Sequence, residues 1–464
     1  MSLTSPPVAS LPPALEETLE SILGDRYSTR PAILQQHGRG ESHHTPAPPA
    51  AVAYVTSSAE VLALARACHR QQTPMIAHGA GTSVEGQLQC VQGGVAVDFS
   101  TMNRILAINP GDQDCLVEPG VTREQLNLAL RDQGLFFPVD PGANATLGGM
   151  AATGASGTTT LRYGGMKANV LALEAVLADG AQIQTGSAAR KSSAGYNLTE
   201  LLIGSEGTLA LITGLRLRLH AIPPHVTTAQ VGFPSVAQAV AAVIAMLQHG
   251  LHPALLELLD SAAMAAVNQY CRTRYPEQPS LFLEFHGTLD ATTEQAACAE
   301  TLCRDQGSTG LQWARQEEDR RRQWHARHQA YYAALAQVPH GQGWVTDVCV
   351  PLSRLAQCIE ATQADSAAAQ LQVPLVGHVG DGNFHLLFSI APDDIERRAR
   401  AEAIHQRLVE RAHSLGGTCT GEHGIGLGKK AFLLQEKGAT TVAVMTAIKK
   451  ALDPMNLLNP GKLF

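Results

Sequence analysis

Long apolar runs, closely paired cysteines and an excess of positive charge are all missing from this 464-residue chain. The longest apolar stretch, Val236–Leu247, has about a dozen residues, whereas a bilayer span needs roughly 20, so no transmembrane segment is expected. The nine cysteines include no Cys-x-x-Cys pair, which indicates buried thiols in a reducing compartment. The formal net charge of −7 argues against a nucleic-acid partner. Because the first residues also lack a signal-peptide pattern, we expect a cytoplasmic protein or one peripheral to the inner membrane.

Glycine is abundant, and its 42 copies are clustered rather than scattered. The length predicts two or three domains, and mixed helical and strand patterns predict an α+β fold. We place an N-terminal helix and strap at 1–50, a cofactor domain at 51–222, a second α+β domain at 223–420 and a C-terminal segment at 421–464 that returns to the cofactor domain.

Local patterns predict helices and strands on both sides of a composition change at Pro223-Pro224. The expected helices are Pro13–Gly24, Ser58–Gln71, Thr122–Gln133, Val236–Gln248, 293–306, 315–336, 393–415 and 437–452. The expected strands are Ala51–Val55, Met75–Ala77, Val95–Phe99, Cys115–Val117, Val170–Leu177, Gln182–Thr185, Leu209–Leu219, Ser280–Gly287, Val345–Val350 and Gly377–Phe388. Gly142–Lys167 shows neither period, so we expect a long functional segment without regular structure.

A first glycine loop, His78–Ser83, follows a predicted strand. Its backbone N–H groups could converge on a phosphate, but a tight strand-to-helix turn explains the pattern equally well. A Rossmann site is suggested by Asp98, which ends a later strand. Val84 stands where the third glycine of that motif belongs, however, so the motif is incomplete.

Two further glycine-rich segments lie in the same predicted domain, one from Pro141 to Gly157 and one from Gly204 to Gly207. Together with the first loop they indicate a large ligand that touches the backbone in several places. A dinucleotide fits this better than a small metabolite does.

In these segments the chain resembles the FAD-binding oxidases and dehydrogenases of the vanillyl-alcohol oxidase (PCMH) fold, in their D-2-hydroxy-acid dehydrogenase branch. The resemblance runs from about residue 50 to the end and implies a two-part FAD domain, an α+β cap domain and the returning C-terminal segment. Thr82 stands where some relatives carry a histidine that links FAD covalently, so non-covalent FAD is implied. The implied FAD contacts are His78, Gly79, Ala80, Gly81, Thr82, Ser83, Pro141, Thr146, Gly148, Gly149, Thr153, Gly154, Ser156, Gly157, Tyr163, Gly164, Glu206, Gly207, Ile212 and Asn459.

Histidines and a glutamate in two other glycine settings suggest a metal site. His378 and His385 flank a turn between two strand-like runs, and Glu422-His423 follows in a later motif. Two imidazoles and a carboxylate suit Zn²⁺ or Mn²⁺ with positions left open, although most of the 18 histidines are expected to be structural. The resemblance implies that His378, His385 and Glu422 bind the metal and that His423 is the catalytic base.

The resemblance also assigns the substrate side. It implies that Arg327 grips the substrate carboxylate and that Asn383 and His423 contact the substrate. Relatives that oxidise 2-hydroxyglutarate carry a threonine and a lysine where this chain has Tyr331 and Val345. A second carboxylate would therefore lack a partner, which favours D-lactate or another small D-2-hydroxy acid. The segment 324–351 resembles the mitochondrial-type D-lactate dehydrogenases.

Several alternatives remain open from the sequence. The chain could be a glycolate oxidase FAD subunit, a D-2-hydroxyglutarate dehydrogenase or, in another class, a metallohydrolase that uses the His/His/Glu set without redox chemistry. No convincing NAD site is present. The electron acceptor expected is a quinone, a cytochrome or an electron-transfer flavoprotein.

Overall fold

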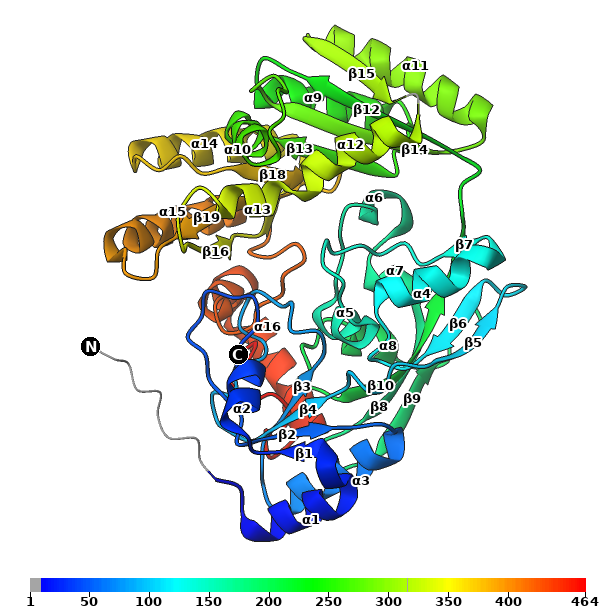
Figure 1. Cartoon of the computed structure of the whole chain (residues 1–464), viewed down its shortest axis with the longest axis vertical. Helices are drawn as coiled ribbons and strands as arrows, with labels where there is room; N and C mark the ends of the chain where they lie inside the picture. The colour runs from blue at the N-terminus through cyan, green and yellow to red at the C-terminus, as the bar shows by residue number, and fades with distance from the viewer. Residues whose placement is uncertain (1–9, 315) are drawn as a thin grey trace. The chain divides into compact units, whose positions relative to one another are not determined.

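The computed structural model describes residues 10–314 and 316–464, and the chain divides into two compact units. Unit 1 comprises Met1–Ser156, Gly164–Ile222 and Glu422–Phe464, and unit 2 comprises Gly157–Tyr163 and Pro223–Gly421 (Figure 1). The chain therefore leaves unit 1 and returns to it at its C-terminal end. None of the helices in the described ranges combines the length and apolar character that a bilayer crossing requires.

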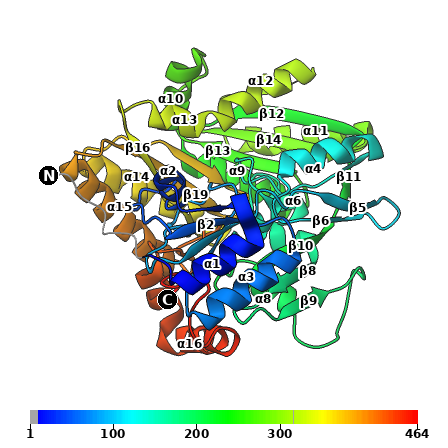
Figure 2. The same ribbon diagram turned by 60° about the horizontal axis from the view of Figure 1, so that its bottom comes forward.

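The first sheet of unit 1 carries the first glycine loop. Its strand order is β1-β2-β4-β3, with β2, β4 and β3 parallel. The helices α1 and α3 contact each other beside it in both views (Figure 1 and Figure 2). The bounds are α1 Pro13–Leu23, η1 Gly24–Arg26, β1 Tyr27–Ser28, α2 Pro31–His37, β2 Ala51–Tyr54, α3 Ser58–Arg70, β3 Met75–His78 and β4 Val95–Asp98.

Local sequence explains where α3 begins and why it packs on this sheet. The Ser57 side chain accepts a hydrogen bond from the backbone N–H of Glu60, which caps the helix. One face of α3, including Val61 and Leu64, is buried in the same apolar cluster as the strand residues Val95 and Val97. This packing fixes the sheet whose carboxyl edge bears the glycine loop.

The second sheet of unit 1 is antiparallel and has the order β5-β6-β10-β8-β9. A short pair, β7 with β11, lies outside it. The strands are β5 Ile105–Asn109, β6 Asp114–Val117, β7 Leu135–Phe136, β8 Val170–Val176, β9 Gln182–Gly186, β10 Leu211–Arg218 and β11 His220–Ala221. The helices are α4 Arg123–Leu130, η2 Arg131–Gln133, α5 Leu147–Thr153, α7 Met166–Asn169 and α8 Leu198–Leu202, whereas α6 Thr160–Tyr163 belongs to unit 2.

The expectation that Gly142–Lys167 lacks regular structure is wrong, because α5, α6 and the start of α7 lie within it. Thr146 accepts a hydrogen bond from Gly149 N and caps α5 at its start, and Gly154, with φ 68°, ends it. Leu147, Met150 and Ala151 then pack into the core of the second sheet. The segment is rich in glycine and alanine, which hides a helix only two turns long.

Unit 2 is built on an eight-stranded antiparallel sheet, with the order β15-β12-β14-β13-β18-β19-β16 and β17 paired to β19. Its strands are β12 His225–Gly232, β13 Leu255–Leu259, β14 Ser280–Gly287, β15 Gly310–Ala314, β16 Gln342–Val345, β17 Val348–Cys349, β18 Leu375–His378 and β19 Asn383–Ile390. Its other helices are α9 Val236–Gln248, α10 Ser261–Cys271, α11 Leu289–Asp305, α12 Glu317–His328, α13 Ala330–Leu335, η3 Leu352–Arg354, α14 Leu355–Ala368 and α15 Ile395–Ser414.

The helix expected over 315–336 is two helices, α12 and α13, and its first residue, 315, lies outside the described residues. The strand expected over Val345–Val350 is also divided. Val345 ends β16, and β17 begins at Val348. These breaks matter because Thr346 and Asp347, between the two strands, are fully buried and contribute to the site described below.

The returning segment of unit 1 contains the long helix α16, Lys430–Leu452, which is interrupted at Gly438. After it, Leu458 forms a parallel bridge with Met75, and Asn459 N donates to Met75 O at 2.9 Å. The last residues of the chain are thereby hydrogen-bonded to the strand that leads into the first glycine loop.

Candidate active site

A cavity in unit 1 gathers residues from every glycine-rich segment of that unit. It opens beside the loop after β3 and is bordered by the start of α5, by Glu206-Gly207 and by the returning segment. Of the residues expected to hold FAD, those that line it are His78, Gly79, Ala80, Gly81, Thr82, Ser83, Pro141, Thr146, Gly148, Gly149, Thr153, Ser156, Glu206, Gly207, Ile212 and Asn459. Glu422 and His423, expected as metal ligand and base, line the same cavity.

Four residues expected to touch FAD do not line this cavity: Gly154, Gly157, Tyr163 and Gly164. Gly154 ends α5 in the left-handed conformation. Tyr163 belongs to unit 2, where its hydroxyl lies 2.7 Å from His286 Nδ1. At Gly164, an added Cβ would lie 2.5 Å from the Cβ of Ala168. Gly154, Tyr163 and Gly164 thus have local structural roles.

The cavity wall is suited to a phosphate-bearing ligand. A Cβ on Gly79 would lie 2.4 Å from Thr146 Oγ1, and one on Gly148 would lie 2.5 Å from the Cβ of Pro119, so only glycine lets these backbones come so close. The buried Ser83 hydroxyl lines the cavity and has no hydrogen-bond partner among the described residues. A bound dinucleotide would give the Ser83 hydroxyl an acceptor and would lie against the exposed backbone of the two glycines. The residues present therefore fit FAD.

Glu206 ties three distant parts of the chain together at the cavity wall. Its Oε1 accepts from Ile425 N at 2.6 Å and its Oε2 from Gly426 N at 2.8 Å, and its own carbonyl accepts from Asn459 Nδ2 at 2.7 Å. Complete burial raises the pKa of Glu206 to about 7, although the two backbone N–H groups act in the opposite sense. The residue holds this conformation at φ 54°, which non-glycine residues rarely adopt.

His423 is fixed through its backbone. Gln87 Nε2 donates to His423 O at 2.9 Å, and Gln87 also lines the cavity. The His423 Nε2 lies 3.9 Å from Glu422 Oε1. The sequence did not indicate Gln87, because a lone glutamine after the glycine loop carries no pattern.

The β18–β19 hairpin of unit 2 presents the two histidines of the other motif together, as the sequence predicts. The His378 and His385 ring centroids lie 5.5 Å apart, because His378 pairs with Asn383 and His385 with Val376 on the same face of the hairpin. His378 Nδ1 lies 2.7 Å from Glu257 Oε1, and His385 Nδ1 lies 2.8 Å from Thr346 O. In a neutral imidazole, donation from Nδ1–H to these oxygens leaves the ring lone pair on Nε2.

Glu257 on β13 joins His378 to Arg327. Its Oε2 accepts from Arg327 Nε at 2.9 Å and from Nη2 at 2.6 Å, while Oε1 faces His378. The glutamate is 1% exposed. Burial alone would raise the pKa of Glu257, but the neighbouring His378 and Arg327 outweigh it and hold the pKa below its usual value. No motif in the sequence marks Glu257 as part of a site.

Asn383 and Asp347 fix the end of the segment that leads to the Glu422-His423 motif. Asn383 Nδ2 donates to Asp347 Oδ1 and to Val348 O, both at 2.7 Å. Asp347 Oδ2 accepts from Thr420 Oγ1 at 2.7 Å and from Gly421 N at 2.8 Å. Because both amide hydrogens of Asn383 are engaged, this side chain supports the turn rather than offering a donor to a ligand.

The side chains around Arg327 on α12 and near Tyr331 and Val345 are either exposed or packed. On α12, Arg321 and Arg322 are exposed and pair with neighbouring acidic residues. Trp324 is buried and donates from Nε1 to Glu284 at 2.6 Å. Tyr331 and Val345 both pack against the apolar cluster formed by α10, α12, α13 and the neighbouring strands. Neither position carries a lysine or an arginine.

Comparisons with known proteins match two family models along the chain. Residues 49–186 match the FAD binding domain family, and residues 222–463 match the C-terminal domain of the FAD linked oxidases. The "probable D-lactate dehydrogenase, mitochondrial" of Danio rerio is 48% identical over 450 residues, which cover 96% of this chain and 90% of that protein. The "D-lactate dehydrogenase [cytochrome], mitochondrial" of Arabidopsis thaliana is 39% identical, with 98% and 80% covered.

Among solved structures, p-cresol methylhydroxylase with substrate bound aligns with a TM-score of 0.80 at 17% identity, covering 98% of each chain. That likeness confirms the expected PCMH-type fold, with helices and sheets in an FAD-binding part and a second part. The family matches extend over both units, and the first relatives match nearly the whole chain. This chain therefore belongs to the FAD-linked oxidases and dehydrogenases, and it is an FAD-dependent oxidoreductase of that family.

Proposed function

We propose that this enzyme oxidises D-lactate, or a similarly small D-2-hydroxy acid, to the 2-keto acid with the help of FAD and a divalent metal. The observation that carries the proposal is the match of nearly the whole chain to D-lactate dehydrogenases. FAD would be held non-covalently by the residues that line the unit 1 cavity, and when bound it would supply the acceptor for the hydride of the substrate. The metallohydrolase alternative loses support because both flavin-family models match.

His378, His385 and Glu422 would hold the metal. The tautomers of the two histidines support this, because engagement of Nδ1 directs each Nε2 lone pair outward, as in other metal-binding histidines. Two imidazoles and one carboxylate suit Zn²⁺ or Mn²⁺ and leave positions for substrate oxygens. A divalent ion there would supply the positive charge that makes a substrate hydroxyl more acidic.

His423 would take the hydroxyl proton, and Arg327 would bind the substrate carboxylate. The fixed backbone of His423 and its place on the cavity wall suit a general base. Arg327 uses Nε and Nη2 for Glu257, so its Nη1 edge is the part offered to a carboxylate. With Tyr331 and Val345 in an apolar cluster, a second carboxylate on the substrate would be left without a partner.

A cytochrome is the electron acceptor that the names of the relatives favour, since two of the most similar are called cytochrome-linked. Placement in the cytoplasm or at the inner membrane stays a prediction, and those relatives are named as mitochondrial.

The decisive experiment follows flavin bleaching without oxygen. D-lactate should bleach the flavin, whereas L-lactate, D-2-hydroxyglutarate and glycolate should do so slowly, and a chelator should abolish the reaction until Zn²⁺ or Mn²⁺ is restored. Faster bleaching by D-2-hydroxyglutarate or glycolate would reject the substrate assignment. Replacing His423 by asparagine should leave FAD and metal bound while most turnover is lost; normal turnover would reject its role as base.

A further inference from the structure

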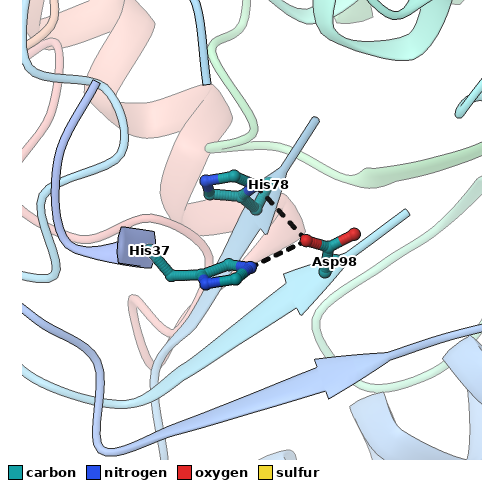
Figure 3. A group of neighbouring side chains, drawn as sticks. All are labelled: His37, His78 and Asp98. Atoms are coloured by element: carbon teal, nitrogen blue, oxygen red, sulfur yellow. Dashed lines mark hydrogen bonds and ion pairs between the residues drawn. The ribbon is translucent and has the colours of Figure 1, made fainter. Parts of the chain in front are cut away.

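Three side chains from separate elements meet at the carboxyl edge of the parallel strands in unit 1. His78 ends β3, Asp98 ends β4, and the two residues are register partners. His37, the last residue of α2, reaches the same place (Figure 3). The carboxyl ends of parallel strands are where open α/β sheets commonly bind ligands.

One carboxylate oxygen is shared by both imidazoles. Asp98 Oδ2 lies 2.8 Å from His37 Nε2 and 3.6 Å from His78 Nδ1, and the two rings are 4.4 Å apart. The other oxygen, Oδ1, accepts from Ser100 N at 2.7 Å, which fixes the carboxylate. His37 is 3% exposed, His78 8% and Asp98 4%, so water hardly reaches them.

A proton or a metal ion must lie between His37 Nε2 and the carboxylate of Asp98. Its Nδ1 lies 2.9 Å from Ile33 O and its Nε2 faces the carboxylate, so both ring nitrogens meet oxygen acceptors. Either Nε2 carries a proton, or its lone pair and the carboxylate share a metal ion. The Nδ1–H···O=C arrangement is the one that fixes metal-binding histidines in other proteins.

His78 distinguishes the two possibilities. Neither of its ring nitrogens has a hydrogen-bond partner among the described residues, although the side chain is about nine-tenths buried. A proton on His37 leaves this second imidazole unsatisfied, at a cost in free energy. A metal ion would engage all three side chains at once.

We propose that His37, His78 and Asp98 bind a second divalent metal ion, Zn²⁺, separate from the metal of the proposed reaction. Two imidazoles and a carboxylate form a borderline N/O ligand set that suits zinc better than Mg²⁺ or Ca²⁺. Tetrahedral zinc with bonds of about 2.0–2.1 Å keeps its ligand atoms roughly 3.3 Å apart. The two spacings to Asp98 Oδ2, 2.8 and 3.6 Å, lie on either side of that value, and one ligand atom from each of the three side chains lies within 4.8 Å of the other two.

The ion would join α2 to two strands and hold the start of the first glycine loop. His78 is the first residue of that loop and lines the cavity beside it. Zinc binding should therefore stiffen one wall of the cofactor cavity without taking part in the oxidation.

The test counts zinc in a background that lacks the other proposed metal site. The FAD-loaded His378→Gln/His385→Gln protein is incubated with Zn²⁺, freed of unbound metal by gel filtration and analysed by elemental mass spectrometry. It should retain about one Zn²⁺ per chain. Adding Asp98→Asn or His78→Gln should remove that ion, whereas adding His69→Gln, a half-buried histidine of α3 outside the cluster, should not.

Thermal unfolding provides a second readout that does not depend on metal recovery. Zn²⁺ should raise the Tm of the background protein and of the His69→Gln control, and should leave the Asp98→Asn protein unchanged. If the background variant does not fold, the same comparison is made in the unmodified enzyme, where Asp98→Asn should lower the zinc content by about one ion per chain. Zinc content that is negligible in the background, or unaltered by Asp98→Asn, would overturn the proposal.

Discussion

Replacing Glu257 by glutamine tests the link between the metal-side histidine and the substrate-side arginine. The carboxylate receives three contacts, at 2.7 Å from His378 and at 2.9 and 2.6 Å from Arg327. A glutamine can still accept from His378 through its oxygen, but its amide then points N–H groups at the N–H groups of Arg327. The substitution should therefore keep the hydrogen bond to His378 but leave the guanidinium of Arg327 without a carboxylate partner.

The expected loss of stability is large because Glu257 is 1% exposed and the Arg327 side chain only 12%. Removing one partner of a buried ion pair costs about 3–5 kcal/mol. We expect Glu257→Gln to lower the free energy of unfolding by about 3 kcal/mol and kcat/KM for D-lactate by about 10–100-fold, the usual effect of losing such a supporting carboxylate. Urea unfolding and steady-state kinetics measure the two effects.

The matched control is Glu284→Gln on the neighbouring strand β14. Glu284 accepts from the neutral donor Trp324 Nε1 at 2.6 Å and contacts His286 at 2.7 Å, so it leaves no arginine stranded. A further variant, Glu257→Gln/Arg327→Met, should regain much of the lost stability while staying inactive, because the unpaired charge is gone. Equal losses in the two glutamine variants, or a change below about 0.5 kcal/mol in Glu257→Gln, would refute the reasoning.

Three other perturbations have clear expected results. Gly79→Ala should lower the flavin-to-protein absorbance ratio, because its Cβ would lie 2.4 Å from Thr146 Oγ1, whereas Gly111→Ala, in open space, should not. Burial raises the pKa of Glu206 to about 7, so the stability that this residue contributes is present below pH 4.5 and is lost as pH rises through 7. Glu206→Gln should therefore make the free energy of urea unfolding depend less on pH between 5 and 8. An unchanged pH dependence would contradict this. Val345→Lys should raise kcat/KM for D-2-hydroxyglutarate relative to D-lactate, and no change in that ratio would count against the role assigned to this position.

Local sequence predicted an element well wherever its own residues carry the signal. The bounds of α9 and β14 match the expected Val236–Gln248 and Ser280–Gly287. The start of α9 is marked in the sequence by Ser235, which caps the helix. Strand β13, Leu255–Leu259, was missed because it is buried at every position, so it lacks the alternation that marks a half-buried strand. The two-turn helix α5 was missed for the related reason that its glycines and alanines show no helical period.

In the candidate site, residues of the sequence motifs were predictable, whereas the residues that hold them in place were not. His378 and His385 were visible because they lie seven residues apart around a glycine turn. Glu257 lies 121 residues before His378 and 70 before Arg327, so only the pairing of β13 with β18 brings it to both. His37 is equally silent in sequence, because the packing of α2 on the sheet edge alone aligns its ring with Asp98.

Glu257 links the histidine of the proposed metal site to the arginine proposed to bind substrate. The motif histidines supply the donor atoms, but the carboxylate of Glu257 sets the tautomer of one and the orientation of Arg327 together. A single buried residue therefore couples metal binding to carboxylate binding, and a change there should alter both properties at once. Substitutions at Val345, which packs in an apolar cluster, should alter the choice of substrate while leaving the metal in place.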